Sequence, residues 1–315
     1  MNSNLKVGVI GAGALGSLIG GLLAEAGANV MLVNPRRREH MEAIQNKGLM
    51  ISTQKGNRTI QCHATSDLQT VKTVDLFVLC VKAPQTEEAV RSSTHMLGDH
   101  TVALSLQNGI GCEEMMSRII GEKRLIGAMT MQGGEYISPG KIRHANDLPT
   151  YIGELNCSST PRINDIGKIF EKAGIKTIVT QNIRRYIWRK VLYCLAFDPI
   201  SAICQFNRGE LFDVESIRNL IPKIIQEGVQ VGRAEGILLE EKDVTWAMEM
   251  AQKAGGGQRL DLPLGGVQID LLRERKTDMV FKTGAIVEFG KKHGIPTPIN
   301  STLWAIINAL ERNFI

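Results

Sequence analysis

The chain has 315 residues, which suggests about two domains and a core that needs neither a disulfide nor a metal ion for stability. Its net charge is +5, and its longest run of basic residues is the three arginines at 36–38, so a nucleic-acid-binding arm is not indicated. The six cysteines include no CxxC pair, a pattern typical of reduced thiols. We therefore predict a cytoplasmic protein without a metal site, whose ligand is a small anionic molecule.

The beginning of the chain has one feature that a targeting segment would share. Residues 7–24 are uncharged and mostly apolar, as in a signal peptide or a membrane anchor. Glycines interrupt this run at positions 8, 11, 13, 16, 20 and 21. Because such a density of glycine fits a tight turn between a strand and a helix better, we predict no membrane segment.

The same region has the pattern of a strand, a turn and a helix. Leu5–Ile10 is predicted to be a buried parallel strand, Leu15–Ala26 a helix that stops at Gly27, and Asn29–Val33 a second strand. The turn between the first strand and the helix is GAGALG, at 11–16. GxGxxG in this context is typical of a dinucleotide-binding site, and the alternative is a glycine-rich buried turn without a ligand.

Each glycine of the motif has a physical role in such a site. Gly11 permits the sharp turn, Gly13 lets the backbone approach the pyrophosphate, and Gly16 lets the helix pack closely on the strand. The helix N-terminus offers amide N–H groups and a partial positive charge to the phosphates. The predicted cofactor-binding residues of the turn are Gly11, Ala12, Gly13, Ala14, Leu15 and Gly16.

The end of the second strand indicates which dinucleotide is bound. NAD-binding proteins place a carboxylate there, whereas an arginine accommodates the 2′-phosphate of NADP. Here the strand is followed by Asn34-Pro35 and three arginines, with no carboxylate before Glu39. We predict NADP(H), bound through Arg36 and Arg37; the alternative is a solvated basic loop.

The βα pattern continues through the first half of the chain. Strands are predicted at 75–81, 101–106 and 125–130, and a helix at 85–96. Lys82 and Asn108 follow two of these strands, at the edge where open α/β sheets bind ligands. Each could also be only a capping or solvent-facing residue.

The pattern then changes twice. Residues 133–154 are predicted to form short strands with a turn at Pro139-Gly140, followed by a helix from Thr160-Pro161 to Ala173 and a last strand at 175–180. The rest of the chain is almost entirely helical, with helices predicted at 183–197, 214–235, 240–254, 277–293 and 300–312. We predict an α/β protein with two domains: residues 1–181, a Rossmann-type doubly wound parallel sheet that binds NADP, and residues 182–315, an all-helical domain with the substrate site.

Taken together, these motifs resemble the ketopantoate reductase (2-dehydropantoate 2-reductase) family over essentially the whole chain. The matching blocks are GAGALG at 11–16, VKAPQT at 81–86, QNGIG at 107–111, PGKI at 139–142, WRKV at 188–191, DPISA at 198–202, and the stretch from Thr277-Asp278 to HGIPTP at 293–298. The resemblance implies an N-terminal Rossmann domain, a helical C-terminal domain, and transfer of hydride from NADPH to the keto carbon of a 2-oxo acid.

The resemblance also implies roles for individual residues. Lys190 matches the catalytic lysine of the family, which hydrogen-bonds the carbonyl oxygen and protonates the forming alkoxide. Asn108 matches an asparagine near the nicotinamide and the substrate. Lys82 matches a lysine on the cofactor side, and we also expect Gly134 to contact the cofactor. The late family glutamate falls at Asp278, one methylene shorter.

The substrate side departs from the family pattern. Two family asparagines are replaced by Cys194 and Asp198, a substrate-binding serine by Gly266, and a further asparagine by Arg208. Residues 190, 194 and 198 would share one face of a straight helix, although Pro199 can bend it. Asp198 would repel a substrate carboxylate unless a cation such as Arg208 neutralises it, and Arg208 could instead clamp the carboxylate itself.

These departures leave several functions open. The default is NADPH-dependent reduction of 2-dehydropantoate to pantoate, a step of pantothenate biosynthesis. The alternatives are the same chemistry on another carbonyl compound, a non-catalytic NADP-binding sensor, and a disulfide, metal or nucleophilic-cysteine enzyme, for which Cys194 is the one candidate thiol. Helices 214–235 and 277–293 could also bury the interface of a homodimer.

Overall fold

The computed structural model describes residues 5–255, 266–312 and 314. By its internal contacts the chain separates into two compact units, which we treat one at a time. Unit 1 comprises the residues up to Gln107 together with Cys112–Ile183. Unit 2 comprises Asn108–Gly111 together with Arg184–Ile315, so that a four-residue loop from the first half of the chain belongs to the second unit.

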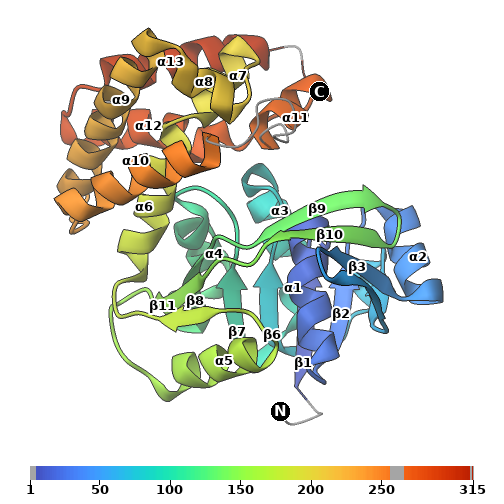
Figure 1. Ribbon diagram of the computed structural model, residues 1–315. Coiled ribbons are helices and arrows are strands. Elements are labelled where there is room, and N and C mark those ends of the chain that lie inside the picture. The colour runs from blue at the N-terminus through green and yellow to red at the C-terminus, as the bar shows by residue number, and fades with distance from the viewer. Residues whose placement is uncertain (1–4, 256–265, 313, 315) are drawn as a thin grey trace. The chain divides into compact units, whose positions relative to one another are not determined.

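Unit 1 is built on a mainly parallel sheet of eight strands (Figure 1). Their order is β12-β11-β8-β7-β6-β1-β2-β5, and only β8 and β11 pair antiparallel. The strands of this sheet, in chain order, are β1 (Lys6–Ile10), β2 (Asn29–Val33), β5 (His63–Thr65), β6 (Val74–Leu79), β7 (Leu97–Ser105), β8 (Leu125–Thr130), β11 (Thr150–Glu154) and β12 (Thr177–Val179). The chain leaves β1 toward β2 on one side and returns to β6 on the other, so the strand order reverses next to β1. In open α/β sheets ligands bind beyond the strand ends at such a point.

Helices cover both faces of this sheet. They are α1 (Ala14–Glu25), α2 (Arg38–Lys47), α3 (Thr86–Ser92), α4 (Cys112–Ile120) and α5 (Pro161–Lys172), with 3₁₀ turns η1 (Leu68–Thr70), η2 (Ala83–Gln85), η3 (Thr94–Met96) and η4 (Glu122–Arg124). Alternate residues of the strands point to opposite faces. Leu76 and Val78 of β6 thus join the core under α1 and α5, whereas Phe77 and Leu79 join the core that α3 and α4 cover.

A second sheet, which the sequence did not predict as a separate layer, lies against the other side of α1. Its order is β4-β3-β10-β9, from β3 (Leu49–Thr53), β4 (Gly56–Ile60), β9 (Gly133–Ser138) and β10 (Lys141–Asn146). Its two halves come from distant parts of the chain, since β10 pairs parallel with β3. The predicted short strands at 133–154 therefore divide between both sheets.

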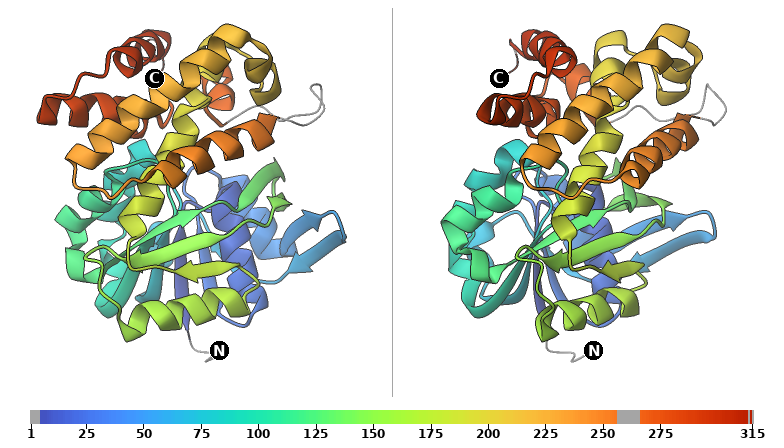
Figure 2. Two further views of the ribbon diagram at one scale, coloured as in Figure 1. Left: turned by 60° about the vertical axis from the view of Figure 1, so that its left-hand side comes forward. Right: turned by 90° about the vertical axis from the view of Figure 1, so that its left-hand side faces the viewer.

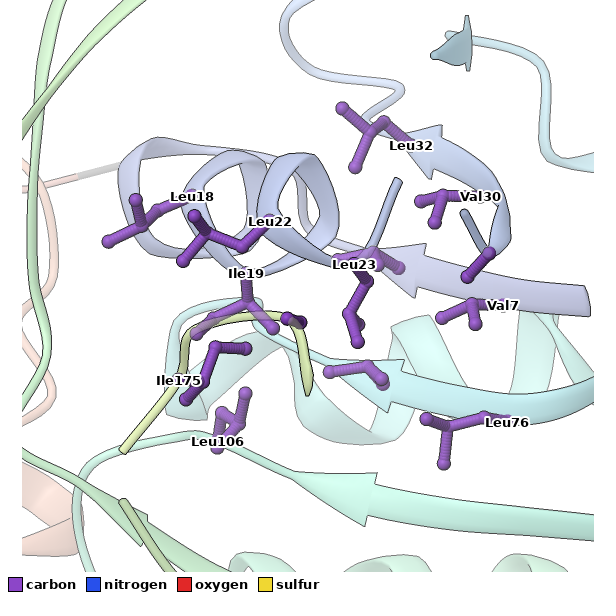
Figure 3. Close-up of a cluster of buried hydrophobic side chains, with 14 of the residues drawn as sticks. Val7, Leu18, Ile19, Leu22, Leu23, Val30, Leu32, Leu76, Leu106 and Ile175 are labelled. Carbon is purple, nitrogen blue, oxygen red and sulfur yellow. The ribbon is translucent and has the colours of Figure 1, made fainter. Parts of the chain in front are cut away.

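Helix α1 is enclosed between the two sheets, which explains why its sequence is apolar on all sides. Figure 3 shows Leu18, Ile19, Leu22 and Leu23 of α1 packed with side chains of the large sheet. Two adjacent glycines allow both sheets to approach. A Cβ atom on Gly20 would lie 2.4 Å from a methyl of Leu32 in β2, and one on Gly21 would lie 2.7 Å from a methyl of Leu49 in β3.

The described part of unit 2 consists of helices (Figure 2, yellow to red, with the loop of 108–111). They are α6 (Ile183–Leu195), α7 (Asp198–Cys204), α8 (Arg208–Asp213), α9 (Glu215–Ala234), α10 (Glu241–Gly255), α11 (Gly266–Leu272), η5 (Met279–Phe281), α12 (Thr283–His293) and α13 (Pro298–Leu310). Ile183 itself is the last residue of unit 1. Gly228 of α9 lets α6 pack closely, because a Cβ atom there would lie 2.9 Å from both Leu192 and Leu195.

Most predicted elements are present, and the α/β class with a helical second half is confirmed. Three predicted helices are longer than the helices in the structure. The helix predicted at 85–96 corresponds to α3, which ends at Ser92 and is followed by the 3₁₀ turn η3. The helix predicted at 183–197 ends at Leu195, and α7 begins at Asp198 with Pro199 in its first turn. The helix predicted at 277–293 begins with the 3₁₀ turn η5 and breaks at Lys282, whose φ of −121° and ψ of −97° are not helical.

None of the helices in the described ranges is both long and apolar enough to span a bilayer.

Candidate functional site

The glycine-rich turn of unit 1 has the close packing that the motif predicts. Gly11 has a φ of +91°, and a Cβ atom on it would lie 2.5 Å from the backbone nitrogen of Val81. A Cβ atom on Gly16 would lie 2.6 Å from the carbonyl oxygen of Gly11. These contacts are with backbone atoms, which cannot move aside, so both positions require glycine. At Gly13 a Cβ atom would meet only Gly11 O, at 3.9 Å, so space remains beside this residue.

The N-terminus of α1 is arranged to receive an anion. Gly13 occupies the N-cap position, and no side chain among the described residues caps the helix there. The amides of the first turn, at Ala14, Leu15 and Gly16, thus have no side-chain acceptor, as a phosphate-binding helix requires. The residues present fit a dinucleotide. Gly134 of β9 lies against this turn, since a Cβ atom on it would be 2.7 Å from Ala14 O. That packing explains the glycine, and its contact with the cofactor stays a prediction.

The two arginines predicted to bind the 2′-phosphate are oriented by different partners. Arg36 Nη2 lies 2.7 Å from Glu88 Oε2 of α3, and both side chains are more than half exposed. The guanidinium of Arg37 stacks on the ring of Tyr136 in β9, 4.3 Å from its centroid. An exposed ion pair contributes at most about 1 kcal/mol, so Arg36 can exchange Glu88 for a phosphate at little cost.

His40, which the sequence analysis did not single out, fixes the surroundings of these arginines. Its Nδ1 accepts a hydrogen bond from the Gly140 N–H at 2.8 Å, so the neutral ring carries its proton on Nε2 and donates to Ser17 Oγ at 3.0 Å. The buried ring therefore connects α1, α2 and the β9–β10 turn. Burial, with a smaller contribution from Arg37, lowers the pKa of His40 to about 4.

We expect His40 to make unit 1 less stable as the pH falls. Between pH 6.5 and about 4 the unfolded chain binds a proton at this residue and the native ring does not, so the free energy of unfolding decreases with decreasing pH. From pH 7 to pH 4 the wild type should lose about 1–2 kcal/mol more than His40→Gln, which keeps a donor and an acceptor but does not titrate. Denaturant unfolding at each pH measures the difference. The exposed His63, changed to Gln, is the control and should follow the wild type; parallel curves for wild type and His40→Gln would contradict the assignment.

The carboxyl ends of β6 and β7 meet at one edge of the sheet, as predicted. Lys82 follows β6 and precedes η2, in an extended conformation and with an exposed side chain. Gln107, which was not predicted, connects the two strand ends. Its Nε2 donates to Val81 O at 2.9 Å and to Thr86 Oγ1 at 2.8 Å. A glutamine that follows a buried strand is the only sequence signal that could have indicated this role.

Asn108 begins the loop that belongs to unit 2, and its side chain is exposed. The loop is held on the segment 279–282. Ile110 N–H donates to Phe281 O at 2.9 Å, and a Cβ atom on Gly109 would lie 2.6 Å from Phe281 Cβ. Gly109 also has a φ of +111°, so the predicted nicotinamide-side asparagine is followed by a position that only glycine fits.

Lys190 and Cys194 lie one turn apart on α6, as the spacing predicted. Lys190 is half-buried, and its Nζ is 4.9 Å from the centroid of the Tyr193 ring. Burial, followed by the nearby Asp198 carboxylate, raises the pKa of the Cys194 thiol to about 11. A thiol that stays protonated at neutral pH is a poor nucleophile, which disfavours Cys194 as a nucleophile.

The rotation of α6 is fixed by an ion pair on another face of the helix. Arg185 donates to Asp243 of α10 through Nε at 3.0 Å, and its Nη2 lies 2.8 Å from the same carboxylate. The Asp243 side chain is fully buried. Lys190 follows Arg185 by five positions, which places the two side chains about 140° apart around the helix. The pair thus holds α6 without occupying the face of Lys190.

Lys282 is a counter-ion of Asp198. Lys282 Nζ lies 2.7 Å from Asp198 Oδ2 and 2.9 Å from Asp278 Oδ1, and all three side chains are less than a tenth exposed. Burial alone would lower the pKa of Lys282, but Asp198 and Asp278 together raise it well above its ordinary value. Lys282 was missed by the sequence analysis. Its spacing of four residues from Asp278 was the available signal.

The two remaining predicted substrate residues lie at helix starts. Arg208 is the first residue of α8, which Asn207 caps by accepting from the N–H groups of Gly209 and Glu210 at 2.9 and 3.1 Å. The side chain of Arg208 lies outside the described residues. Gly266 is the exposed first residue of α11. Their contacts with a substrate stay predictions.

Comparison with known proteins shows the family to which this chain belongs. The model described as "Ketopantoate reductase PanE/ApbA" matches residues 7–156, and the model of its C-terminal part matches residues 182–311. The chain belongs to the ketopantoate reductase family. The 2-dehydropantoate 2-reductase of Pyrococcus horikoshii is 32% identical over 98% of both chains. A crystal structure of a family ketopantoate reductase from Ralstonia eutropha is 28% identical, with a TM-score of 0.88, over 98% of this chain and 99% of the other.

A further likeness concerns the fold alone. A D-mandelate dehydrogenase, solved with NADH and anilino(oxo)acetate, has a TM-score of 0.90 at 23% identity, over 98% of this chain and 99% of that one. In this member of the family the glycine-rich turn belongs to unit 1 and Lys190 belongs to unit 2.

Proposed function

We propose that this chain is an NADPH-dependent 2-dehydropantoate 2-reductase, which reduces 2-dehydropantoate to pantoate in pantothenate biosynthesis. The observation that supports the proposal is Lys190 on α6, one turn before Cys194, whose thiol is within electrostatic range of Lys190 and of the carboxylates of Asp198 and Asp278, which pair with Lys282. The family of the chain is named for this reaction. The uncapped N-terminus of α1 supports the dinucleotide, and the arginines at 36 and 37 support the 2′-phosphate.

In this proposal the residues of the chain have distinct tasks. Unit 1 binds the cofactor through the turn of 11–16, whose amides at 14–16 lie in the first turn of α1, and through Arg36, Arg37 and Lys82. NADPH when bound supplies the hydride. The Lys190 ammonium donates a hydrogen bond to the substrate carbonyl oxygen, which stabilises the negative charge that develops there. It then gives that oxygen a proton, which completes the hydroxyl group and leaves Lys190 neutral until solvent reprotonates it. Asn108 and Asp278 are proposed to orient the substrate beside Lys190.

The experiment that tests the proposal is NADPH oxidation at 340 nm with 2-dehydropantoate, run beside a panel of other 2-oxo acids. We expect 2-dehydropantoate to have the highest kcat/KM of the panel. A different preferred acid would show that Cys194, Asp198 and Gly266 have changed the substrate while the chemistry is kept. Tight binding of NADPH without turnover of any acid would favour an NADP-binding sensor.

Two further predictions belong with this proposal. We infer that the enzyme acts in the cytoplasm, which the six cysteines support since all are thiols in the described structure. We also infer that a homodimer forms through apolar faces of the helical unit, which Ile306 and Leu310 of α13 support because both are more than 40% exposed. Sedimentation of the purified protein measures its oligomeric state.

A further inference from the structure

Lys282 is a buried cation between two buried carboxylates from different segments. Asp198 begins α7, and Asp278 immediately precedes η5. The Nζ atom lies 2.7 Å from one carboxylate and 2.9 Å from the other, and Lys282 itself is 4% exposed. The desolvation of such charges offsets most of their attraction, so a buried ion pair adds little stability over an apolar pair of the same size. Stability alone therefore does not account for this cluster.

The cluster lies where the chain departs from its family and close to the proposed catalytic lysine. Cys194 is one turn beyond Lys190 on α6, and its thiol is within electrostatic range of Lys190, Asp198, Asp278 and Lys282 together. Phe281, the residue before Lys282, holds the loop that begins with Asn108. Its carbonyl oxygen accepts a hydrogen bond from the Ile110 N–H of that loop. One short segment thus contacts both the cluster and the loop that carries the predicted substrate asparagine.

The formal charges of the ionisable side chains around Cys194 sum to zero only if Lys282 is counted. Lys190 and Lys282 are cationic, Asp198 and Asp278 are anionic, and their formal charges sum to zero. An asparagine at 198 would need no counter-ion. With Asp198 present and Lys282 absent, the neighbourhood of Lys190 would carry one net negative charge. At an effective dielectric constant near 20, one such charge about 6 Å from a substrate carboxylate weakens binding on the order of 10²-fold.

We propose that Lys282 is a specificity-determining residue: it is the built-in counter-cation of Asp198 that allows an anionic 2-oxo acid to bind beside Lys190. The inference rests on the proposed function. It identifies Lys282 as the residue whose charge cancels the repulsion between Asp198 and the carboxylate of the substrate. Lys282 acts on the substrate through the charge that it cancels, without contacting the reacting atoms.

A charge cycle tests the proposal with three variants: Lys282→Met, Asp198→Asn, and the two combined. The readout is calorimetric binding of 2-dehydropantoate to the protein saturated with NADP⁺, a pair of oxidised ligands that cannot react. We expect Lys282→Met to weaken binding on the order of 10²-fold. Asp198→Asn should bind at least as tightly as the wild type, and the double variant should return to within about tenfold of it. The methyl ester of 2-dehydropantoate, which has no charge, should bind all four proteins alike.

The outcomes separate a role in specificity from a structural one. A merely structural Lys282 would leave the double variant as weak as Lys282→Met and would weaken the ester equally, and that result overturns the inference. If Lys282→Met does not fold, the affinities of Asp198→Asn and of the double variant for 2-dehydropantoate still test the inference. Loss of affinity for the anion in Asp198→Asn overturns the proposal, and so does failure of the wild type to bind it.

The experiment also distinguishes this inference from the proposed function. Binding to the NADP⁺ form requires no turnover, so a chain that binds the acid with the expected charge dependence but never reduces it refutes only the proposed function. In an active enzyme, the same variants should change KM for the acid far more than kcat. An unchanged KM in Lys282→Met refutes only the inference.

Discussion

Replacing Lys190 by alanine should lower kcat for the preferred 2-oxo acid by about 10³-fold or more, because general-acid and electrostatic stabilisation are both lost. Both act on the carbonyl oxygen, where negative charge develops as hydride arrives. A water molecule can enter the space left by the side chain, but it is a weaker acid and is not held in place. The loss should therefore fall mainly on kcat rather than on KM.

The affinity for NADPH should stay within a few fold of the wild type in Lys190→Ala, since the predicted phosphate-binding groups all belong to unit 1. Fluorescence titration of NADPH measures this affinity, and steady-state oxidation at 340 nm measures turnover. Lys223→Ala, at an exposed position of α9, is the matched control and should leave both values unchanged. Full turnover in Lys190→Ala would remove this lysine from the mechanism.

The double variant Arg36→Ala, Arg37→Ala should weaken NADPH binding by about 10²-fold while changing NADH binding only a few fold. Hydrogen bonds to charged groups contribute about 1.5–3 kcal/mol each, and the two cofactors differ by the 2′-phosphate that these arginines are predicted to bind. Neither arginine is committed elsewhere at high cost. Arg36 is in an exposed pair with Glu88, and Arg37 stacks on Tyr136, which leaves its N–H edge available to a phosphate.

The third arginine of the run supplies the control. Arg38 Nε lies 2.7 Å from Glu42, one turn away in α2, and both side chains are more than half exposed. Arg38→Ala should therefore leave the ratio of NADPH to NADH affinity unchanged, although it removes the same formal charge as either one of the other two substitutions. Equal losses for both cofactors in the double variant would show that the arginines support the adenine end in general and that the 2′-phosphate is recognised elsewhere.

The elements of unit 1 that could be predicted are those whose signal is local. β2 and β8 have the predicted bounds, β1 starts one residue later than predicted, and α1 differs by one residue at each end, because apolar runs and glycines mark these elements. The second sheet could not be predicted from such signals. β4 is almost entirely exposed and reads as a polar loop, and β10 finds its partner β3 about ninety residues earlier in the chain.

The candidate site shows the same division. Lys190, Asn108 and Asp278 were identified by resemblance, and the structure places Asp278 in one cluster with Asp198. Lys282 was missed because lysines on helices are usually exposed and because its partner Asp198 is 84 residues away in sequence. The charge at 198 was correctly taken to need a cation, but only the fold could show which one.

The enclosure of α1 between two sheets has a consequence for how a cofactor binds. Residues 16–23 of α1 are buried, so the packing on both sides fixes the orientation of the helix and of its N-terminal amides. Binding a pyrophosphate should then need little rearrangement of this helix, because the amides that would donate to it are already held in place. The arginines that are predicted to choose between NADP and NAD lie instead on the largely exposed turn after β2. The preference for NADP or NAD can therefore change through substitutions in this turn, without disturbing helix α1, whose amides would bind the pyrophosphate of either cofactor.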